Sequence, residues 1–198
     1  MALLEAPTTV AAADARRVHV DDSLVAVPFV PPGRIADLGA GAGVPGLVLA
    51  AALPDRSFVL VESARRKCAF ISETAAAMGL ANVEVLHARA EEVRPAFEGV
   101  CARALAALPV LCEYAAPLLA MGGVAIFWKG AVEPSEEADG RHAASELGLS
   151  EPEVVPVEPF PGSQRRTLWV FRKTSPTPDR FPRRPGMATK RPLSAPSS

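Results

Sequence analysis

The feature that most constrains the fold is a glycine-rich segment, DLGAGAGVPG (37–46), which continues directly from the short apolar run RIADL (34–38). Glycine allows the backbone to turn sharply and to approach a ligand closely. A glycine loop between a strand and a helix is typical of α/β folds that bind nucleotides at the carboxyl ends of parallel strands. The segment therefore predicts an α/β domain whose ligand site lies beside residues 37–46.

Apolar runs recur along the chain and alternate with stretches of helical periodicity. This alternation predicts right-handed βαβ units, and hence a mostly parallel sheet with helices on both faces. A later pair of short runs predicts an antiparallel strand at one edge. The predicted fold class is therefore α/β and Rossmann-like, with strands at 34–38, 57–62, 82–87, 99–104, 122–130, 153–157 and 167–171.

The net charge of −1 conceals an uneven distribution of 21 Lys and Arg and 22 Asp and Glu. Residues 1–164 carry 12 basic and 21 acidic side chains, whereas residues 165–198 carry 9 basic and 1 acidic. A basic terminal segment on an acidic body favours an anionic partner. We expect a short N-terminal segment at 1–18 that forms one short helix, a single domain at 19–173, and a basic, proline-rich tail at 174–198 that is extended or disordered.

Two carboxylates near the loop bear on the choice of cofactor. Gly41, Gly43 and Gly46 match the dinucleotide fingerprint, so an NAD-dependent oxidoreductase is one interpretation. Asp37 opposes it, because a carboxylate there repels a pyrophosphate and attracts the cationic amino group and sulfonium of S-adenosylmethionine. Glu62 ends the second strand and suits the ribose hydroxyls of either cofactor. Asp37 therefore favours S-adenosylmethionine, and the structural alternative is that both acids cap helices or face solvent.

The residues after the third and fourth strands indicate which chemistry the site supports. Backbone amides of Ala90 and Glu91 are placed to read an adenine ring, or else to begin a helix rich in acids. The sequence at 101–105 lacks the Asn/Asp-Pro-Pro-aromatic loop of amine methylation, and Cys101 lacks the Pro-Cys context of a nucleophile. The site therefore favours a target that is already nucleophilic.

Guanine N7 is such a target, because its free lone pair needs only alignment with a methyl group. Arg103 is the expected catalytic residue, since a guanidinium donates in bidentate fashion to a guanine edge. An ion pair with Asp37 or Glu62 is the structural alternative for the same side chain.

Taken together, these blocks resemble the RsmG (GidB) family of bacterial methyltransferases. The matching blocks cover nearly the whole chain in order: HVDDSL (19–24), DLGAGAGVPG (37–46), ESARRKCAF (62–70), NVEVLHARAEE (82–92), ARA (102–104), WKG (128–130), RRTLWVFRK (165–173) and FPRRPGMATKRPL (181–193). The resemblance implies a class I methyltransferase fold, S-adenosylmethionine as methyl donor, and methylation of guanine N7 in 16S ribosomal RNA.

The resemblance also assigns roles by position. Gly39 and Val44 are expected at the methionine end, Glu62 at the ribose, and Ala90 with Glu91 at the adenine. Arg103 is expected between cofactor and target. The full set expected to bind cofactor is Asp37, Gly39, Gly41, Val44, Glu62, Ser63, Ala90, Glu91 and Arg103.

The chain departs from the family at two places. Only eighteen residues precede His19, where family members carry a longer helical segment, and Ala102 stands where serine is expected. A non-catalytic ribosome-binding module that retains the cofactor pocket therefore remains an alternative, as does a methyltransferase for a small molecule.

Basic residues near the predicted cleft are candidates for binding RNA. Three of them fall in the first turn of a helix, where the helix dipole disfavours cations, and a phosphate partner would explain this placement. Among the aromatic residues, Tyr114, Trp128 and Trp169 are expected in the core, and Phe181 is the exposed candidate for stacking on a base. The expected RNA-binding residues are Arg65, Arg66, Lys67, Lys129, Arg165, Arg166, Arg183 and Arg184.

The cysteines indicate a reducing compartment. Cys68, Cys101 and Cys112 form no CxxC pair and lie far in sequence from a histidine cluster, so neither a metal site nor a disulfide framework is expected. No membrane span or signal peptide is expected either. We therefore expect a cytoplasmic monomer whose partner is 16S rRNA or the small ribosomal subunit.

Overall fold

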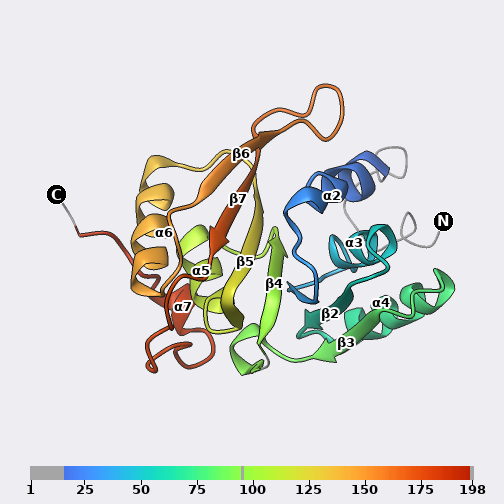
Figure 1. Ribbon diagram of the computed structural model, residues 1–198, viewed down its shortest axis with the longest axis horizontal. Helices are drawn as coiled ribbons and strands as arrows, with labels where there is room; N and C mark the ends of the chain where they lie inside the picture. Colours follow the sequence, from blue (N-terminus) through green and yellow to red (C-terminus); the bar gives the residue numbers. More distant parts are fainter. Residues whose placement is uncertain (1–15, 95, 197–198) are drawn as a thin grey trace.

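The computed structural model describes residues 16–94 and 96–196. Its centre is a seven-stranded sheet with the order β3-β2-β1-β4-β5-β7-β6 (Figure 1). Strands β1 to β5 are parallel, whereas β7 runs antiparallel to both β5 and β6. The bounds are β1 Arg34–Leu38, β2 Ser57–Glu62, β3 Val83–His87, β4 Phe97–Arg103, β5 Leu119–Lys129, β6 Glu153–Val157 and β7 Arg166–Arg172.

Helices cover both faces of the sheet (Figure 1). The first face carries the N-terminal helical turns with α3 and α4, and the second face carries α5 to α7. The helical bounds are η2 Arg16–Asp21, α2 Asp22–Leu24, η3 Val27–Phe29, α3 Gly46–Ala52, α4 Arg65–Ala77, η4 Ala90–Glu92, α5 Leu108–Ala115, α6 Pro134–Glu146 and α7 Met187–Lys190.

The central strands are apolar without interruption because both of their faces are buried. In β5, Val124 and Ile126 pack into the cluster under α3 and α4, whereas Ala125 and Phe127 pack into the cluster under α5 and α6. Successive strand residues point to opposite faces, so one continuous apolar run supplies both cores. Trp128 and Trp169 are buried as expected.

The predicted strands and the sheet class are confirmed. The largest difference is in β5, which begins at Leu119 and not at residue 122. The predicted late pair is also confirmed, since β6 and β7 pair antiparallel with Val154 opposite Trp169. The expected N-terminal helix at 1–18 falls mostly outside the described residues, and its described part, residues 16–18, begins η2.

The C-terminal tail differs from the expectation of an extended or disordered arm. Residues 174–196 fold back onto the α5 and α6 side of the sheet, where Ala188 is 2% exposed. The expectation that Phe181 is exposed is wrong, because this ring is 8% exposed and joins the same apolar cluster. Composition does not predict the folded position of this mainly polar segment, because a few buried side chains fix it through long-range contacts.

Within the described residues, no helix has both the length and the apolar character required to cross a membrane. The same part of the chain holds no group of three or more His, Cys, Asp and Glu side chains suited to a metal ion. The three cysteines are buried and free.

Candidate active site

The glycine loop is held by hydrogen bonds to strands β1 and β2. After β1, the amide of Ala40 donates to the carbonyl of Val61 over 3.0 Å, which ties the turn to β2. The amide of Gly46 then donates to Oδ2 of Asp37 over 2.9 Å. A Cβ at Gly46 would lie 2.6 Å from that oxygen and 2.8 Å from Leu60 Cγ. Only glycine therefore lets α3 begin this close to the end of β1.

Asp37 lies beneath the loop and is 1% exposed. One oxygen accepts the Gly46 amide, and the other, Oδ1, is buried without a hydrogen-bond partner in the described part of the chain. Burial raises the pKa of Asp37 to about 7, while the Gly46 amide and the charge of Arg103 oppose this shift and the charge of Glu62 adds to it. A cation next to Oδ1 would satisfy the orphaned oxygen and stabilise the charged form.

Glu62 supports the loop from the end of β2. Its Oε2 accepts the amide of Gly41 over 2.9 Å, and its Oε1 accepts the amide of Ala64 over 2.8 Å. The Ser63 hydroxyl lies 3.5 Å from Oε1. Because a carboxylate offers about four acceptor positions, Glu62 keeps capacity for a ribose hydroxyl.

These bonds distinguish between the two cofactor classes. A dinucleotide pyrophosphate needs free loop amides at the start of a helix. Here the amides of Gly41 and Gly46 already donate to carboxylates and are not free for a pyrophosphate, and the negative charge of Glu62 would repel it. The arrangement fits S-adenosylmethionine, with Asp37 toward its cationic part and Glu62 toward its ribose, and it disfavours NAD.

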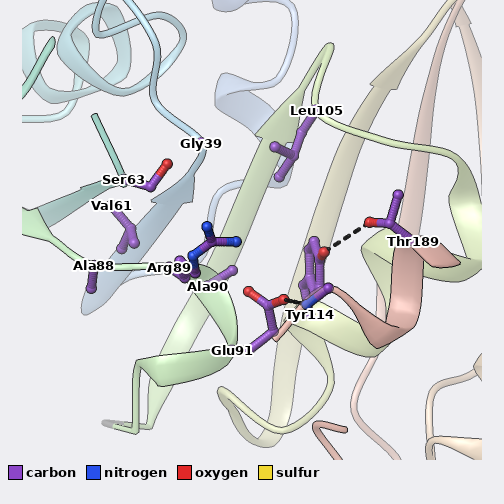
Figure 2. Close-up of a pocket in the computed structure, with 11 residues that line it drawn as sticks. Gly39, Val61, Ser63, Ala88, Arg89, Ala90, Glu91, Leu105, Tyr114 and Thr189 are labelled. Atoms are coloured by element: carbon purple, nitrogen blue, oxygen red, sulfur yellow. Dashed lines mark hydrogen bonds between the residues drawn. The ribbon is translucent and has the colours of Figure 1, made fainter. Parts of the chain in front are cut away.

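A cavity of about 190 Å³ opens beside the loop (Figure 2). Figure 2 shows Val61, Ser63 and Ala88 on one side of it, with Tyr114 and Thr189 facing them across the cavity. Four residues that the sequence predicted for the cofactor line it, namely Gly39, Ser63, Ala90 and Glu91. Four further lining residues were not predicted to contact the cofactor, and these are Leu105, Tyr114, Gly186 and Thr189.

Glu91 has a second partner that the sequence did not indicate. Its side chain is 7% exposed, and its Oε1 accepts the amide of Gly186 from the C-terminal tail over 2.9 Å. The predicted adenine contact of the Ala90 and Glu91 amides fits their place in the wall of the cavity. Val44 lies elsewhere, buried in the apolar cluster under α3, so its contact with the methionine end stays a prediction.

Arg103 ends β4 and is held by residues of η2 and α2. Its Nη1 donates to Asp22 Oδ2 over 2.8 Å and to the Val18 carbonyl over 2.7 Å, and its Nη2 lies 3.3 Å from His19 Nδ1. The expected alternative, an ion pair with Asp37 or Glu62, is wrong, because the ion-pair partner of Arg103 is Asp22. Trp128 Nε1 donates to the Asp22 carbonyl over 2.7 Å and so fixes the acid in place.

His19 belongs to the same buried group and is 6% exposed. A guanidinium only donates, so Nδ1 of His19 is the acceptor and Nε2 carries the hydrogen of the neutral ring. Burial is the main cause that lowers the pKa of His19; the Arg103 charge lowers it further, and the Asp22 charge raises it. The ring is therefore neutral at pH 7 and able to accept from Arg103.

The predicted RNA-binding residues lie in two kinds of environment. Lys129, Arg166 and Arg183 have acidic partners, respectively Glu136 at 2.6 Å, Asp22 at 3.9 Å and Glu113 at 2.5 Å. The other five are exposed: Arg65, Arg66, Lys67, Arg165 and Arg184. Four of these five follow the end of β2 or precede the start of β7, and they therefore lie at the same edge of the sheet as the cavity: Arg65, Arg66, Lys67 and Arg165.

The sheet order, together with a glycine loop whose amides donate to Asp37 and Glu62, defines the class of protein: a class I S-adenosylmethionine-dependent methyltransferase. The crystal structure of a predicted O-methyltransferase from Agrobacterium tumefaciens is similar, with a TM-score of 0.63 and 26% identity over 79% of this chain and 80% of that chain. The methyltransferase SibL shares the fold at a TM-score of 0.68 and 17% identity, over 83% of this chain and 57% of that chain. Within this class, the chain belongs to the GidB family, rRNA small subunit methyltransferase G, whose model matches residues 9–160.

A curated relative supports the same assignment. Ribosomal RNA small subunit methyltransferase G of Rubrobacter xylanophilus is 42% identical over 187 residues, which cover 88% of this chain and 72% of that protein. The resemblance predicted from the sequence blocks is thereby confirmed.

Proposed function

We propose that this chain transfers the methyl group of S-adenosylmethionine to N7 of a guanine in 16S ribosomal RNA. The observation that carries the proposal is the placement of Arg103, whose guanidinium is anchored at the carboxyl end of β4, next to the strand that leads into the glycine loop. Family membership supports the same donor and the same class of RNA.

S-adenosylmethionine, when bound, supplies an electrophilic methyl group on a sulfonium. Asp37 would hold the cationic part and Glu62 the ribose, while the cavity wall at Ala90 and Glu91 would hold the adenine. Guanine N7 attacks with its own lone pair, so the chain needs no general base for this step. Its task is to exclude water and to align the purine edge.

Arg103 is suited to that alignment. Two of its contacts hold Nη1 and a third holds Nη2, which leaves other guanidinium hydrogens to donate to a purine edge. A bidentate arginine contact with the O6 and N7 edge would occupy the reacting atom, so we assign Arg103 to O6 or to the neighbouring phosphate. The exposed basic residues Arg65, Arg66 and Lys67 would bind phosphates beside the cleft.

The partner in this proposal is the small ribosomal subunit or its 16S rRNA, met in the cytoplasm by a single copy of the chain. The test incubates undermethylated small subunits and naked 16S rRNA with labelled methyl donor and then maps the modified base. Labelling of a guanine at N7 is the expected result. Labelling of small metabolites with no labelling of RNA would overturn the proposal in favour of a small-molecule methyltransferase.

The control reaction uses the Arg103→Lys variant at equal protein concentration. This variant keeps the positive charge but loses the planar fork, so we expect normal folding and reduced labelling at the same base. A fully folded wild-type protein that binds donor but labels neither form of the RNA would instead favour a non-catalytic ribosome-binding module.

A further inference from the structure

The C-terminal tail is joined to α5 by an ion pair within the fold. The guanidinium of Arg183 donates from Nε to Glu113 Oε1 over 2.8 Å and from Nη2 to Oε2 over 2.5 Å. Glu113 is 1% exposed, and the backbone amide of Arg183 also donates to its Oε1 over 3.2 Å. Such a buried carboxylate is costly without its partner, so this contact fixes where the tail crosses α5.

Beyond Arg183, the tail reaches the cavity itself. The amide of Gly186 donates to Glu91 Oε1, and the hydroxyl of Thr189 lies 3.2 Å from the hydroxyl of Tyr114 (Figure 2). Gly186 has a φ of +81°, a left-handed conformation that turns the chain into α7. Both Gly186 and Thr189 line the cavity together with Glu91 and Tyr114.

Apolar anchors hold this stretch at both ends. Phe181 and Ala188 are 8% and 2% exposed, and both pack into the core cluster under α5 and α6. The stretch between them therefore has a defined position against η4 and α5. A segment that only tethered RNA would need neither these anchors nor bonds to two buried acids.

We propose that residues 181–190 form one wall of the cofactor site and close it over the nucleoside half of S-adenosylmethionine, with the Arg183–Glu113 ion pair as the latch. The inference rests on the proposed function, because it takes the cavity at Gly39, Ser63 and Ala90 to be the nucleoside subsite. It gives the tail a role in binding cofactor that precedes any contact with RNA.

The test measures the binding of S-adenosylhomocysteine to the full chain by titration calorimetry, without RNA. Arg183→Gln removes the latch, and Thr189→Val removes one hydroxyl at the cavity while conserving shape and leaving no charge unpaired. We expect the dissociation constant to rise about tenfold or more for Arg183→Gln and about threefold for Thr189→Val. Arg191→Gln is the matched control, because Arg191 is an exposed cation that directly follows the segment, and it should bind as the wild type does.

A double variant keeps the test decisive if Arg183→Gln folds poorly. Glu113→Gln with Arg183→Gln replaces the ion pair by two amides that can hydrogen-bond to each other, so no buried charge is left alone. We expect it to fold and to bind S-adenosylhomocysteine more weakly than the wild type, because two neutral amides hold the tail less firmly than an ion pair does.

The outcomes separate this inference from the proposed function. The role of the tail would be overturned if folded Thr189→Val and the double variant bound S-adenosylhomocysteine as tightly as the wild type does, and Arg183→Gln did so too where it folds. That result would leave the methyltransferase proposal intact. A folded wild-type chain that does not bind S-adenosylhomocysteine would overturn both. Weaker binding in Arg191→Gln, equal to that in Arg183→Gln, would show a charge effect and not a wall, and would also overturn the inference.

Discussion

Nη1 of Arg103 donates to Oδ2 of Asp22 over 2.8 Å, which joins the carboxyl end of β4 to a residue 81 positions earlier in the chain. The Asp22 side chain is 3% exposed and that of Arg103 is 15% exposed, so this pair is largely withdrawn from water. The bond gives a physical role to the HVDDSL block at 19–24, which in the sequence is only one part of a resemblance. The block holds the arginine that we assign to substrate alignment.

The substitution Arg103→Lys should distinguish a role of Arg103 in aligning the substrate from a role in the stability of the fold. The lysine keeps a charge next to Asp22 but cannot hold three acceptors in one plane, so we expect single-turnover methyl transfer to fall about 10-fold to 100-fold. The free energy of unfolding should change by only about 1 kcal/mol, whereas Arg103→Ala should cost about 3 kcal/mol because Asp22 stays buried and unpaired. Urea unfolding of each variant supplies the comparison. A lysine variant with wild-type turnover would show that Arg103 is purely structural.

His19 should make this contact sensitive to acid. Its folded-state pKa is lowered from the usual 6.5, chiefly by burial, so the unfolded chain binds more protons as the pH falls below that value. The contribution of His19 to the free energy of unfolding should therefore decrease as the pH falls from about 6.5 toward 5. His19→Asn keeps an acceptor near the position of Nδ1 and cannot be protonated. Chemical unfolding at several pH values should show the wild type losing stability relative to the variant as the pH falls over this range, and parallel curves would contradict the assignment.

The strands and the loop were predictable because their signals are local. The apolar alternation and the run at 37–46 are contained within single elements, and they placed β1, β2 and the two acids correctly. The partners of Arg103 and Glu91 were not predictable, since Asp22 and Gly186 lie 81 and 95 positions away. Nothing in composition distinguishes a solvated Arg184 from an Arg183 that neutralises a buried glutamate. Deleting the whole tail is therefore a poor test of RNA binding, because it would also leave Glu113 unpaired.

Gly46→Ala should disturb the loop and the cofactor site together. The added Cβ would meet Asp37 Oδ2 at 2.6 Å and Leu60 at 2.8 Å, and both of these side chains are buried in close-packed surroundings. We expect a loss of about 1–3 kcal/mol in the free energy of unfolding and weaker binding of S-adenosylhomocysteine. Gly130→Ala is the matched control, since a Cβ there would meet no atom within 4 Å. Equal effects of the two substitutions in thermal unfolding and calorimetry would argue against a close approach at Gly46.

The exposed cations after β2 should contribute to RNA binding by neutralising phosphates. Arg65→Gln and Arg66→Gln should each lower the slope of log affinity against log salt by about 0.7–0.9 for every phosphate that the arginine neutralises in the wild type. Arg172→Gln provides the control, because Arg172 is also exposed. Arg172 lies opposite Val124, where the parallel pairing of β5 with β4 begins, and so lies at the other end of the sheet from the cavity. Filter binding of 16S rRNA at several salt concentrations gives the slopes. If the slope falls equally in all three variants, the charge effect is general and this edge is not the binding surface.

Asp37 should couple cofactor binding to pH. Its folded-state pKa of about 7 lies above the usual 3.8, so the native chain binds more protons than the unfolded chain between these values. The contribution of Asp37 to the free energy of unfolding should then decrease as the pH rises from about 4 to about 7, by at most about 1.4 kcal/mol per pH unit. A cationic amino group next to the orphaned Oδ1 favours the ionised acid, so the affinity for S-adenosylhomocysteine should rise with pH until about 7 and then level. Asp37→Asn still accepts from Gly46 but cannot ionise, and both dependences should flatten in this variant. Calorimetry from about pH 5.5 to 8.5 compares the two proteins, and an equally steep rise in the variant would place the titrating group elsewhere.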